Sequence, residues 1–255
     1  MPSFFHHKTP VLLKDPLQAP VPELRDAQIA AVYYAQRMGG DFYDFLRVSP
    51  DRVLFGLLDA AGGREETRAI LSAVQHTFRT VGAELFAQQE INEPEAMIEL
   101  CHQLNRAVLQ AAAGVHSCPA FAGCYNENLG IVCYFNAGHI PGLLRDHTNV
   151  TPLPATTLPL GLFSHATSDA PMVALEPGAA LLLASRGIVE AKCQDEEYGL
   201  ERVSATLQRA VGETAKQLCT TVLEKVQEFM CRPPTDNDVT ALALSRGANV
   251  QIAAS

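Results

Sequence analysis

Two short segments near the start of the chain, each combining glycine with aspartate, constrain its fold more than any other feature. The first, GGDFYDF (residues 39–45), places Asp41 and Asp44 just after a Gly-Gly turn. The second, LFGLLDAAGG (residues 54–63), leads an apolar strand into Asp59 and a small glycine-rich loop. Carboxylates at strand ends beside glycines suit Mg²⁺ and Mn²⁺, because these ions prefer hard oxygen ligands. The two segments therefore predict one metal site shared between neighbouring strands.

The composition describes a well-cored soluble protein and excludes several classes of partner. The 255 residues are 47% hydrophobic and 18% charged, with a formal net charge of −9. This acidity argues against nucleic acid, because phosphate binding requires basic patches. The N-terminus lacks the apolar region of a signal peptide, and no apolar run is long enough to span a membrane. We therefore expect a cytoplasmic protein without a nucleic-acid or membrane partner.

The cysteines follow no recognisable spacing. They stand at Cys101, Cys118, Cys124, Cys133, Cys193, Cys219 and Cys231, without a CxxC pair. An odd, unpatterned set of this kind is typical of reduced core thiols in a cytosolic protein. The adjacent Cys101 and His102 are not expected to form a nucleophile and base, because neighbouring helical residues point about 100° apart. A core cysteine beside a surface histidine is the expectation.

Hydrophobic periodicity predicts strands and helices in an ordered alternation. Strands are expected at 27–35, 53–58, 121–125, 131–135, 143–144, 172–175, 180–184 and 239–244. Helices are expected at 65–85, from an N-cap at Asn92 to a stop at Gly114, at 199–211 and at 214–230. Two helices early, two late and strands between them indicate sheets covered by helices on both outer sides.

Six further blocks of sequence occur in one order. They are LLDAAGG (57–63), FNAGHIPGLLR (135–145), LPLGLF (158–163), LLLASRGIVEA (181–191), EEYGLERV (196–203) and NDVTALAL (237–244), all downstream of GGDFYDF. In this order and spacing the chain resembles the metal-dependent PPM (type 2C-like) serine/threonine phosphatases, in the branch named after stage II sporulation protein E. His139, in the NAGH segment, is expected to be a structural histidine that bonds across a turn.

The resemblance implies an α+β fold, a four-layer α-β-β-α sandwich with a two-metal site at one edge of the central sheets. We expect residues 1–25 to form an extended N-terminal segment, residues 26–246 the phosphatase domain, and residues 247–255 a frayed tail. In this family a water bridging two Mn²⁺ or Mg²⁺ ions attacks a phosphoserine or phosphothreonine in line. The metals lower the pKa of that water and neutralise charge on the phosphoryl oxygens.

One half of the implied metal site keeps its oxygen donors. Asp59 matches the family's bridging aspartate, which touches both metals, and Ala60 stands where a backbone carbonyl is a ligand. Asp41 matches a ligand of the same metal, and Asp44 a carboxylate that holds a water or supports the ligands. The resemblance therefore assigns the catalytic roles to Asp59 and Asp41.

The other half of the implied site has changed. The family's T-D-G motif is here Ser-Arg-Gly, with Arg186 in place of the aspartate, and the first aspartate of D-D-x-T is Asn237. The glycine-histidine-glycine after the bridging aspartate is altered and ends in Arg64, a candidate phosphate contact. Asp238 would join the metal only through a one-residue register shift, which turns every neighbouring side chain to the opposite face.

These changes have a large electrostatic consequence. At an effective dielectric constant of about 20, a unit charge some 4 Å away is worth roughly 4 kcal/mol, and a dication feels about twice that. We therefore expect a one-metal or metal-poor site. Arg186 is expected to neutralise Asp59 or to grip a phosphate with two hydrogen bonds, and Asn237 to lie beside it.

Two functions follow as hypotheses. The first is a cytosolic phosphatase for a phosphoserine or phosphothreonine protein, with an anti-sigma factor antagonist as the substrate that the resemblance implies. Its regulation would come from a separate partner or from a homodimer. The second is a pseudophosphatase, in which the fold binds a phosphoprotein or regulates another enzyme in a partner-switching pathway without turnover. The sequence ranks the phosphatase narrowly first.

Overall fold

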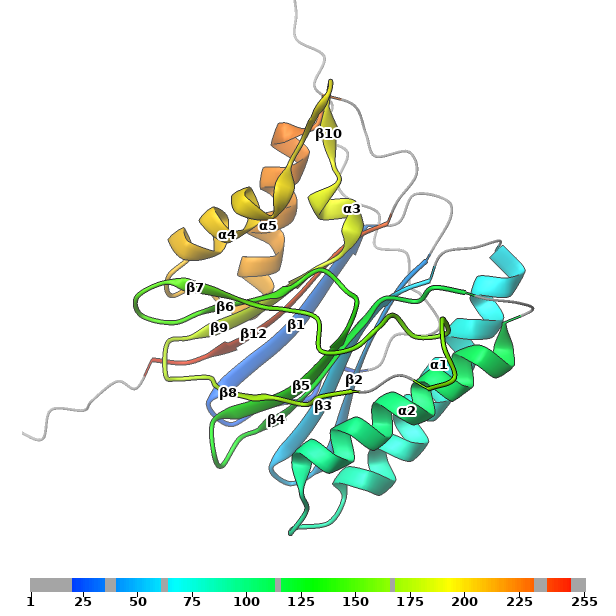
Figure 1. Ribbon diagram of the computed structural model, residues 1–255. Helices are drawn as coiled ribbons and strands as arrows, with labels where there is room; N and C mark the ends of the chain where they lie inside the picture. The colour runs from blue at the N-terminus through cyan, green and yellow to red at the C-terminus, as the bar shows by residue number, and fades with distance from the viewer. Residues whose placement is uncertain are drawn as a thin grey trace, which may run out of the picture.

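Two antiparallel five-stranded sheets lie face to face, and helices cover the outer face of each (Figure 1). The computed structural model describes residues 20–34, 40–60, 64–112, 116–165, 168–231 and 238–248, with the backbone alone at 64–66. The layers run helix, sheet, sheet, helix, which confirms the predicted α+β, four-layer α-β-β-α sandwich. Within the described ranges, no helix combines the length and apolar character needed to cross a membrane.

The first sheet has the strand order β1-β12-β9-β6-β7. Its strands are β1 (Ala27–Tyr34), β6 (Gly142–Arg145), β7 (Val150–Leu153), β9 (Ala180–Ala184) and β12 (Val239–Arg246). β12 lies between β1 and β9, so the last strand of the domain is held on both edges. This placement brings the start of β12 to the end of β9, where the segments Ser-Arg-Gly and Asp-Val-Thr meet.

The second sheet has the strand order β2-β3-β4-β5-β8. Its strands are β2 (Asp41–Ser49), β3 (Arg52–Asp59), β4 (Ala120–Asn126), β5 (Ile131–Ala137) and β8 (Met172–Ala174). β2 and β3 form an antiparallel hairpin, so Asp41 at the start of β2 lies beside Asp59 at the end of β3.

Two pairs of helices form the outer layers, with a short helix between them in sequence. The elements are α1 (Arg64–Phe86), α2 (Glu93–Ala111), α3 (Arg186–Val189), α4 (Gly199–Arg209) and α5 (Ala215–Phe229). Asn92 is the N-cap of α2, as predicted, and its side chain accepts a hydrogen bond from the backbone of Glu95. Thr214 caps α5 in a capping box with Gln217, which satisfies two otherwise unpaired groups at the helix start.

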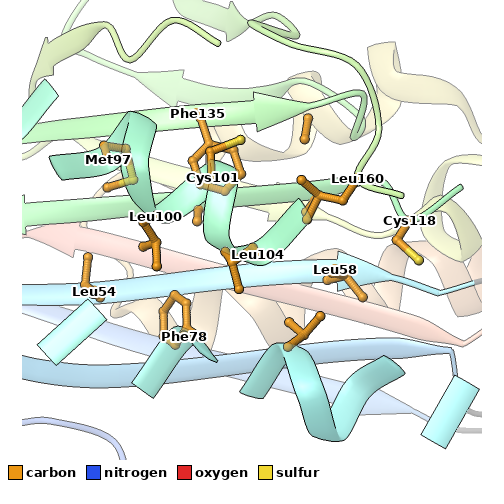
Figure 2. Packing of buried hydrophobic residues seen from close by; sticks show 14 of the residues in the cluster. Leu54, Leu58, Phe78, Met97, Leu100, Cys101, Leu104, Cys118, Phe135 and Leu160 are labelled. Atoms are coloured by element: carbon orange, nitrogen blue, oxygen red, sulfur yellow. The ribbon is translucent and has the colours of Figure 1, made fainter. Parts of the chain in front are cut away.

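Three apolar clusters fill the spaces between the four layers. One lies between α1, α2 and the second sheet (Figure 2), one between the two sheets, and one between α4, α5 and the first sheet. β3 contributes to two of them, because Leu54 and Leu58 face the helices while Phe55 and Leu57 face the other sheet. Alternate residues of a strand point to opposite faces, so a strand buried on both sides is apolar throughout.

The structure adds elements that periodicity did not predict. β2, β7 and α3 were not expected, and a two-stranded hairpin is formed by β10 (Lys192–Cys193) and β11 (Glu196–Glu197). β7 lies at the edge of its sheet and contains Pro152, a residue that edge strands tolerate and that weakens the sequence signal for a strand. The expected stop at Gly114 lies outside the described residues; the helix ends at Ala111.

The expectation that all seven cysteines are reduced core thiols is wrong for two of them. Cys193 of the β10–β11 hairpin forms a disulfide with Cys231, two residues beyond the end of α5. The other five, at 101, 118, 124, 133 and 219, are free and buried. A disulfide between residues 38 positions apart depends on tertiary structure, so spacing alone does not reveal it.

A buried ion pair joins the tip of the β2–β3 hairpin to the start of α2. The Glu93 carboxylate accepts hydrogen bonds from Arg52 Nε at 2.7 Å and from Asn126 Nδ2 at 2.7 Å. The two terminal nitrogens of Arg52 donate to the carbonyl oxygens of Gln88 and Gln89. Arg52 and Glu93 are only 5% and 6% exposed, so neither charge could be solvated by water if its partner were lost.

Replacing this glutamate is expected to destabilise the fold strongly. Glu93→Ala leaves a buried arginine without its carboxylate and should lower the free energy of unfolding by about 3–5 kcal/mol. Glu99→Ala, at an exposed position of the same helix, should change it by less than about 0.5 kcal/mol. Urea unfolding followed by circular dichroism measures both. Equal midpoints for the two variants would contradict the structural role given to the pair.

Candidate functional site

The two predicted aspartates lie directly opposite one another. Asp41, the first residue of β2, pairs in register with Asp59, the last residue of β3. Residues paired across antiparallel strands point to the same face of the sheet. The structure therefore brings both carboxylates to one edge of the sheet, as the sequence predicted.

Backbone packing around Gly40 fixes this edge. The Ala60 N–H donates to the Gly40 carbonyl at 2.8 Å, and the Asp59 N–H donates to the Pro119 carbonyl at 2.9 Å. A Cβ atom at Gly40 would lie 2.6 Å from the Ala60 carbonyl oxygen, closer than a real Cβ can approach. Glycine is therefore required here by the close approach of two backbones. The Ala60 carbonyl lies against this turn, beside the Asp59 side chain.

The start of β12 completes the cluster from the other sheet. Oδ2 of Asp238 accepts hydrogen bonds from the backbone N–H of Gly40 at 2.7 Å and of Asp41 at 3.4 Å. The Thr240 hydroxyl donates to Oδ2 of Asp41 at 2.6 Å. The two sheets thus meet through side chains of β12 that bind the beginning of β2. Asp238 reaches the cluster, whereas Asn237 lies outside the described residues.

Ser185 joins the end of β9 to the same segment. Its hydroxyl donates to the Asp238 carbonyl at 3.2 Å and accepts from the Thr240 N–H at 2.9 Å. Ser185 is fully buried and is the N-cap of α3. The Ser185 hydroxyl does not cap the helix but binds the start of β12, which ties the residue before Arg186 to that strand.

Arg186 forms an ion pair with Asp59, the predicted bridging aspartate. Nε of Arg186 is 3.2 Å from Oδ2 of Asp59, and 3.9 Å from Oε2 of Glu190 one turn along α3. The Asp59 side chain is 13% exposed and that of Arg186 44% exposed, so the ion pair lies at the rim of the site and the arginine is its more exposed member. The ion pair is one of the two contacts expected for Arg186; the other, a grip on a phosphate, stays a prediction.

The electrostatics of the cluster are those of crowded carboxylates. The pKa of Asp41 is raised from 3.8 to about 8, chiefly because burial removes water from the carboxylate. The charges of Asp59 and Asp238 raise this pKa further, and hydrogen bonds from Thr240 and Ser185 oppose the shift. Without a cation beside it, Asp41 is therefore protonated at neutral pH.

The geometry does not fit the two-metal centre that the fold family implies. Among the residues with described side chains, no three His, Cys, Asp or Glu side chains converge in a way that could hold a metal ion. One oxygen each of Asp59, Asp41 and Asp238 already binds a guanidinium, a hydroxyl or backbone amides. The remaining Oδ1 of Asp238 is buried without a hydrogen-bond partner among the described residues. The metal roles given to Asp41, Asp59, Ala60 and Asp238 stay predictions.

Asp44 does not belong to this cluster. It is buried on the face of β2 that packs on α1, where Arg79 binds it with two hydrogen bonds of 2.8 and 2.9 Å. Residues three apart in a strand point to opposite faces, so Asp41 and Asp44 cannot serve one site. The expected role of Asp44 beside the metal is corrected to that of a structural ion pair. The side chain of Arg64, the proposed phosphate contact, lies outside the described part of the chain.

His139 is placed as a structural histidine, in agreement with the sequence. Its backbone N–H donates to Oδ1 of Asn136 at 2.8 Å, and its Nδ1 lies 2.9 Å from the Ile140 carbonyl. Burial lowers the pKa of this imidazole, and the nearby Asp59 charge opposes the shift. Gly40, Ser185 and Thr240 were not among the predicted site residues. The only signal for them is their place beside the acidic residues in the same motifs.

Two facing sheets with outer helix pairs, and an acidic cluster where the starts of β2 and β12 meet, define the PP2C-type serine/threonine phosphatase fold. Residues 49–247 match the family model for stage II sporulation protein E (SpoIIE). The chain therefore belongs to the SpoIIE family, which confirms the resemblance found in its motifs. No curated protein matches the chain.

Solved structures share this architecture. The RsbU and RsbW domains of a Mycobacterium tuberculosis protein align with a TM-score of 0.71 and 25% identity, over 90% of this chain and 63% of that one. The SiaA PP2C domain of Pseudomonas aeruginosa gives 0.68 and 18%, over 85% and 84% of the two chains. A SpoIIE fragment from Bacillus subtilis, with its PP2C domain, gives 0.68 and 14%, over 88% and 64%. The present chain thus spans less than two thirds of the first and third of these proteins.

The crowded carboxylates make a prediction about pH. Some carboxyl groups have a higher pKa in the folded state than in the unfolded state. For such a group, the free energy of unfolding falls as the pH rises from the unfolded pKa to the folded pKa. For Asp41 this window runs from 3.8 to about 8. Asn does not titrate, so Asp41→Asn removes this loss of stability. The change that the substitution makes to the free energy of unfolding of the metal-free protein should therefore be more favourable at pH 8 than at pH 4, by at least about 1 kcal/mol.

Thermal unfolding in EDTA at pH 4, 6 and 8 measures this effect. Asp195→Asn, at an exposed position, is the control and should leave the pH dependence of the wild type unchanged. If Asp41→Asn and wild type lose stability equally between pH 4 and pH 8, the Asp41 carboxyl group is not protonated in the folded protein.

Proposed function

We propose that this protein uses the PP2C fold to bind a phosphoserine or phosphothreonine protein, with little or no metal-dependent hydrolysis. The observation that carries the proposal is the ion pair between Arg186 and Asp59. A guanidinium occupies the place where the family's motif supplies a metal-binding carboxylate, and it engages the carboxylate expected to bridge two metals. This observation reverses the narrow ranking that the sequence alone favoured.

Arg186 is suited to a phosphate. Its Nε faces Asp59, and with 44% of the side chain exposed the rest of the guanidinium can meet a ligand from solvent. Arginine presents its N–H groups in a planar fork that matches two oxygens of a phosphate, and its charge does not depend on pH in the physiological range. A bound phosphoryl group would thus meet the cation that here replaces a metal.

A second candidate function is phosphatase activity with one or two Mn²⁺ or Mg²⁺ ions. The observations that favour it are the side-by-side Asp41 and Asp59, the Ala60 carbonyl at the same edge, and the unpartnered Oδ1 of Asp238. One similar structure, that of RsbX, is a complex with magnesium. For this candidate Arg186 would have to leave Asp59 when metal is present.

The proposed partner is a phosphorylated protein of a partner-switching pathway, such as an anti-sigma factor antagonist. Two similar structures support this proposal, one of RsbU and RsbW domains and one from the bacterial stressosome. Such a role places the protein in the cytoplasm, with regulation through a partner or a homodimer.

The binding role is tested with a fluorescent phosphoserine peptide and its unphosphorylated counterpart, by polarisation in EDTA. We expect the wild type to prefer the phosphopeptide and Arg186→Gln to weaken that binding by at least about tenfold, because one charge-assisted contact is lost. Arg209→Gln, an exposed arginine at the end of α4, is the matched control. Phosphate release with Mn²⁺ that Asp59→Asn abolishes would instead support the second candidate.

Restoring the family's carboxylates should restore metal binding. The double variant Arg186→Asp with Asn237→Asp removes one positive charge and adds two negative ones near Asp59. We expect the affinity for Mn²⁺, measured by calorimetry, to rise by at least about tenfold over wild type. Arg209→Asp controls for the exchange of an exposed arginine for an aspartate away from Asp59. A double variant that binds no more Mn²⁺ than wild type would show that these motifs are wrongly aligned with the site.

A further inference from the structure

A pocket of about 490 Å³ lies between α2 and the segment that follows β7, away from the aspartate cluster. One wall is a single face of α2, formed by His102, Asn105, Arg106 and Leu109, which follow the i, i+3, i+4, i+7 spacing of neighbours on a helix. The facing wall comes from residues 157–165. His102 and Arg106 are exposed while Cys101 is buried, as the sequence predicted for Cys101 and His102. The volume falls within the range of small-molecule sites.

The two walls are held together by specific contacts. The Asn105 side chain accepts from the Gly161 N–H at 2.8 Å and donates to the Phe163 carbonyl at 2.9 Å. Gly161 has a φ of +84°, and a Cβ there would lie 2.6 Å from both the His116 carbonyl oxygen and a Val108 methyl. The segment therefore approaches α2 as closely as a glycine allows, and the pocket is already formed without a ligand.

The lining of the pocket carries basic side chains in an acidic protein. Arg106, His102 and His165 all contribute to it, and among its described lining residues none is an aspartate or a glutamate. Arg106 forms no hydrogen bond or ion pair with another described residue, whereas Arg52, Arg79 and Arg186 each bind a carboxylate. An unpaired guanidinium beside two imidazoles attracts an anion.

The remainder of the lining is apolar. Leu109, Leu158 and Leu160 border the same space, and Leu158 is 50% exposed. Leu160 also exchanges two backbone hydrogen bonds with Cys118, adjacent to the Pro119 carbonyl that binds the Asp59 N–H. Figure 2 shows Leu160 and Cys118 close to Leu58, near the end of β3. The pocket is thus a separate site joined to the aspartate cluster through one short backbone segment.

We propose that this pocket binds a small organic anion, a phosphorylated or carboxylated molecule with an apolar group. Arg106 and the two histidines bind the anionic group, and the leucines cover the apolar part. Small-molecule sites combine an apolar lining with a few polar groups that fix orientation, and this pocket has both. The proposal does not depend on the proposed function, because no residue of the aspartate cluster takes part in it.

The test is an NMR titration of ¹⁵N-labelled full-length protein with four probes. They are naphthylmethylphosphonate and naphthoate, which carry both groups, and methylphosphonate and naphthylmethanol, which carry one each. We expect saturable shifts at the amides of residues 102–109 and 158–165 with one or both of the first two probes. Which of them binds more tightly identifies the anionic group. The single-group probes should bind at least about tenfold more weakly.

Three variants decide where the probes bind. Arg106→Gln should weaken the two-group probes by at least about tenfold, and Arg209→Gln, the matched control, should not change their affinity. Arg186→Gln separates this site from the aspartate cluster and should leave the shifts at residues 102–109 intact. The proposal is overturned if no probe gives saturable shifts there, if naphthylmethanol binds as tightly as the anions, or if Arg106→Gln binds like wild type.

Discussion

The register between β2 and β3 is the constraint on which the whole site depends. A slip of one residue would turn Asp41 to the opposite face, because side chains alternate along a strand. The register is fixed by the close contact of Gly40 with the Ala60 carbonyl and by the hydrogen bonds that Asp238 accepts from the Gly40 and Asp41 amides. The buried apolar side chains on both faces of β3 oppose the same slip.

Three carboxylates gather at this edge, and the chain neutralises each in a different way. Asp59 is paired with Arg186, Asp41 has a pKa raised to about 8, and Asp238 accepts backbone amides. Each of these solutions replaces part of what a divalent cation would do at a cluster of like charges. A metal would have to displace the guanidinium from Asp59 and the proton from Asp41, so the protein competes with the ion for its own ligands.

The sequence contained most of the fold but only part of the site. The long apolar strand that ends in Asp59 and the amphipathic helices were predictable, because their periodicity reflects burial. β2 was missed because its aspartates resemble a loop: Asp44 is buried only through its ion pair with Arg79, a partner 35 residues away. The Cys193–Cys231 disulfide and the contacts of Thr240 and Ser185 with the cluster were missed for the same reason. They depend on which segments meet in three dimensions, and no local pattern encodes that.

The altered motifs explain how the fold tolerates a changed site. Ser185 stands where the family has a threonine, and its hydroxyl still bonds both the Asp238 carbonyl and the Thr240 N–H. The next position is a partly exposed rim residue, so exchanging an aspartate for Arg186 disturbs none of the three apolar clusters. Along this short segment, a residue that holds the sheets together is followed by a residue in the position of a metal ligand. Because different residues hold the sheets and bind the cation, a metal ligand can be replaced while the fold that positions it persists.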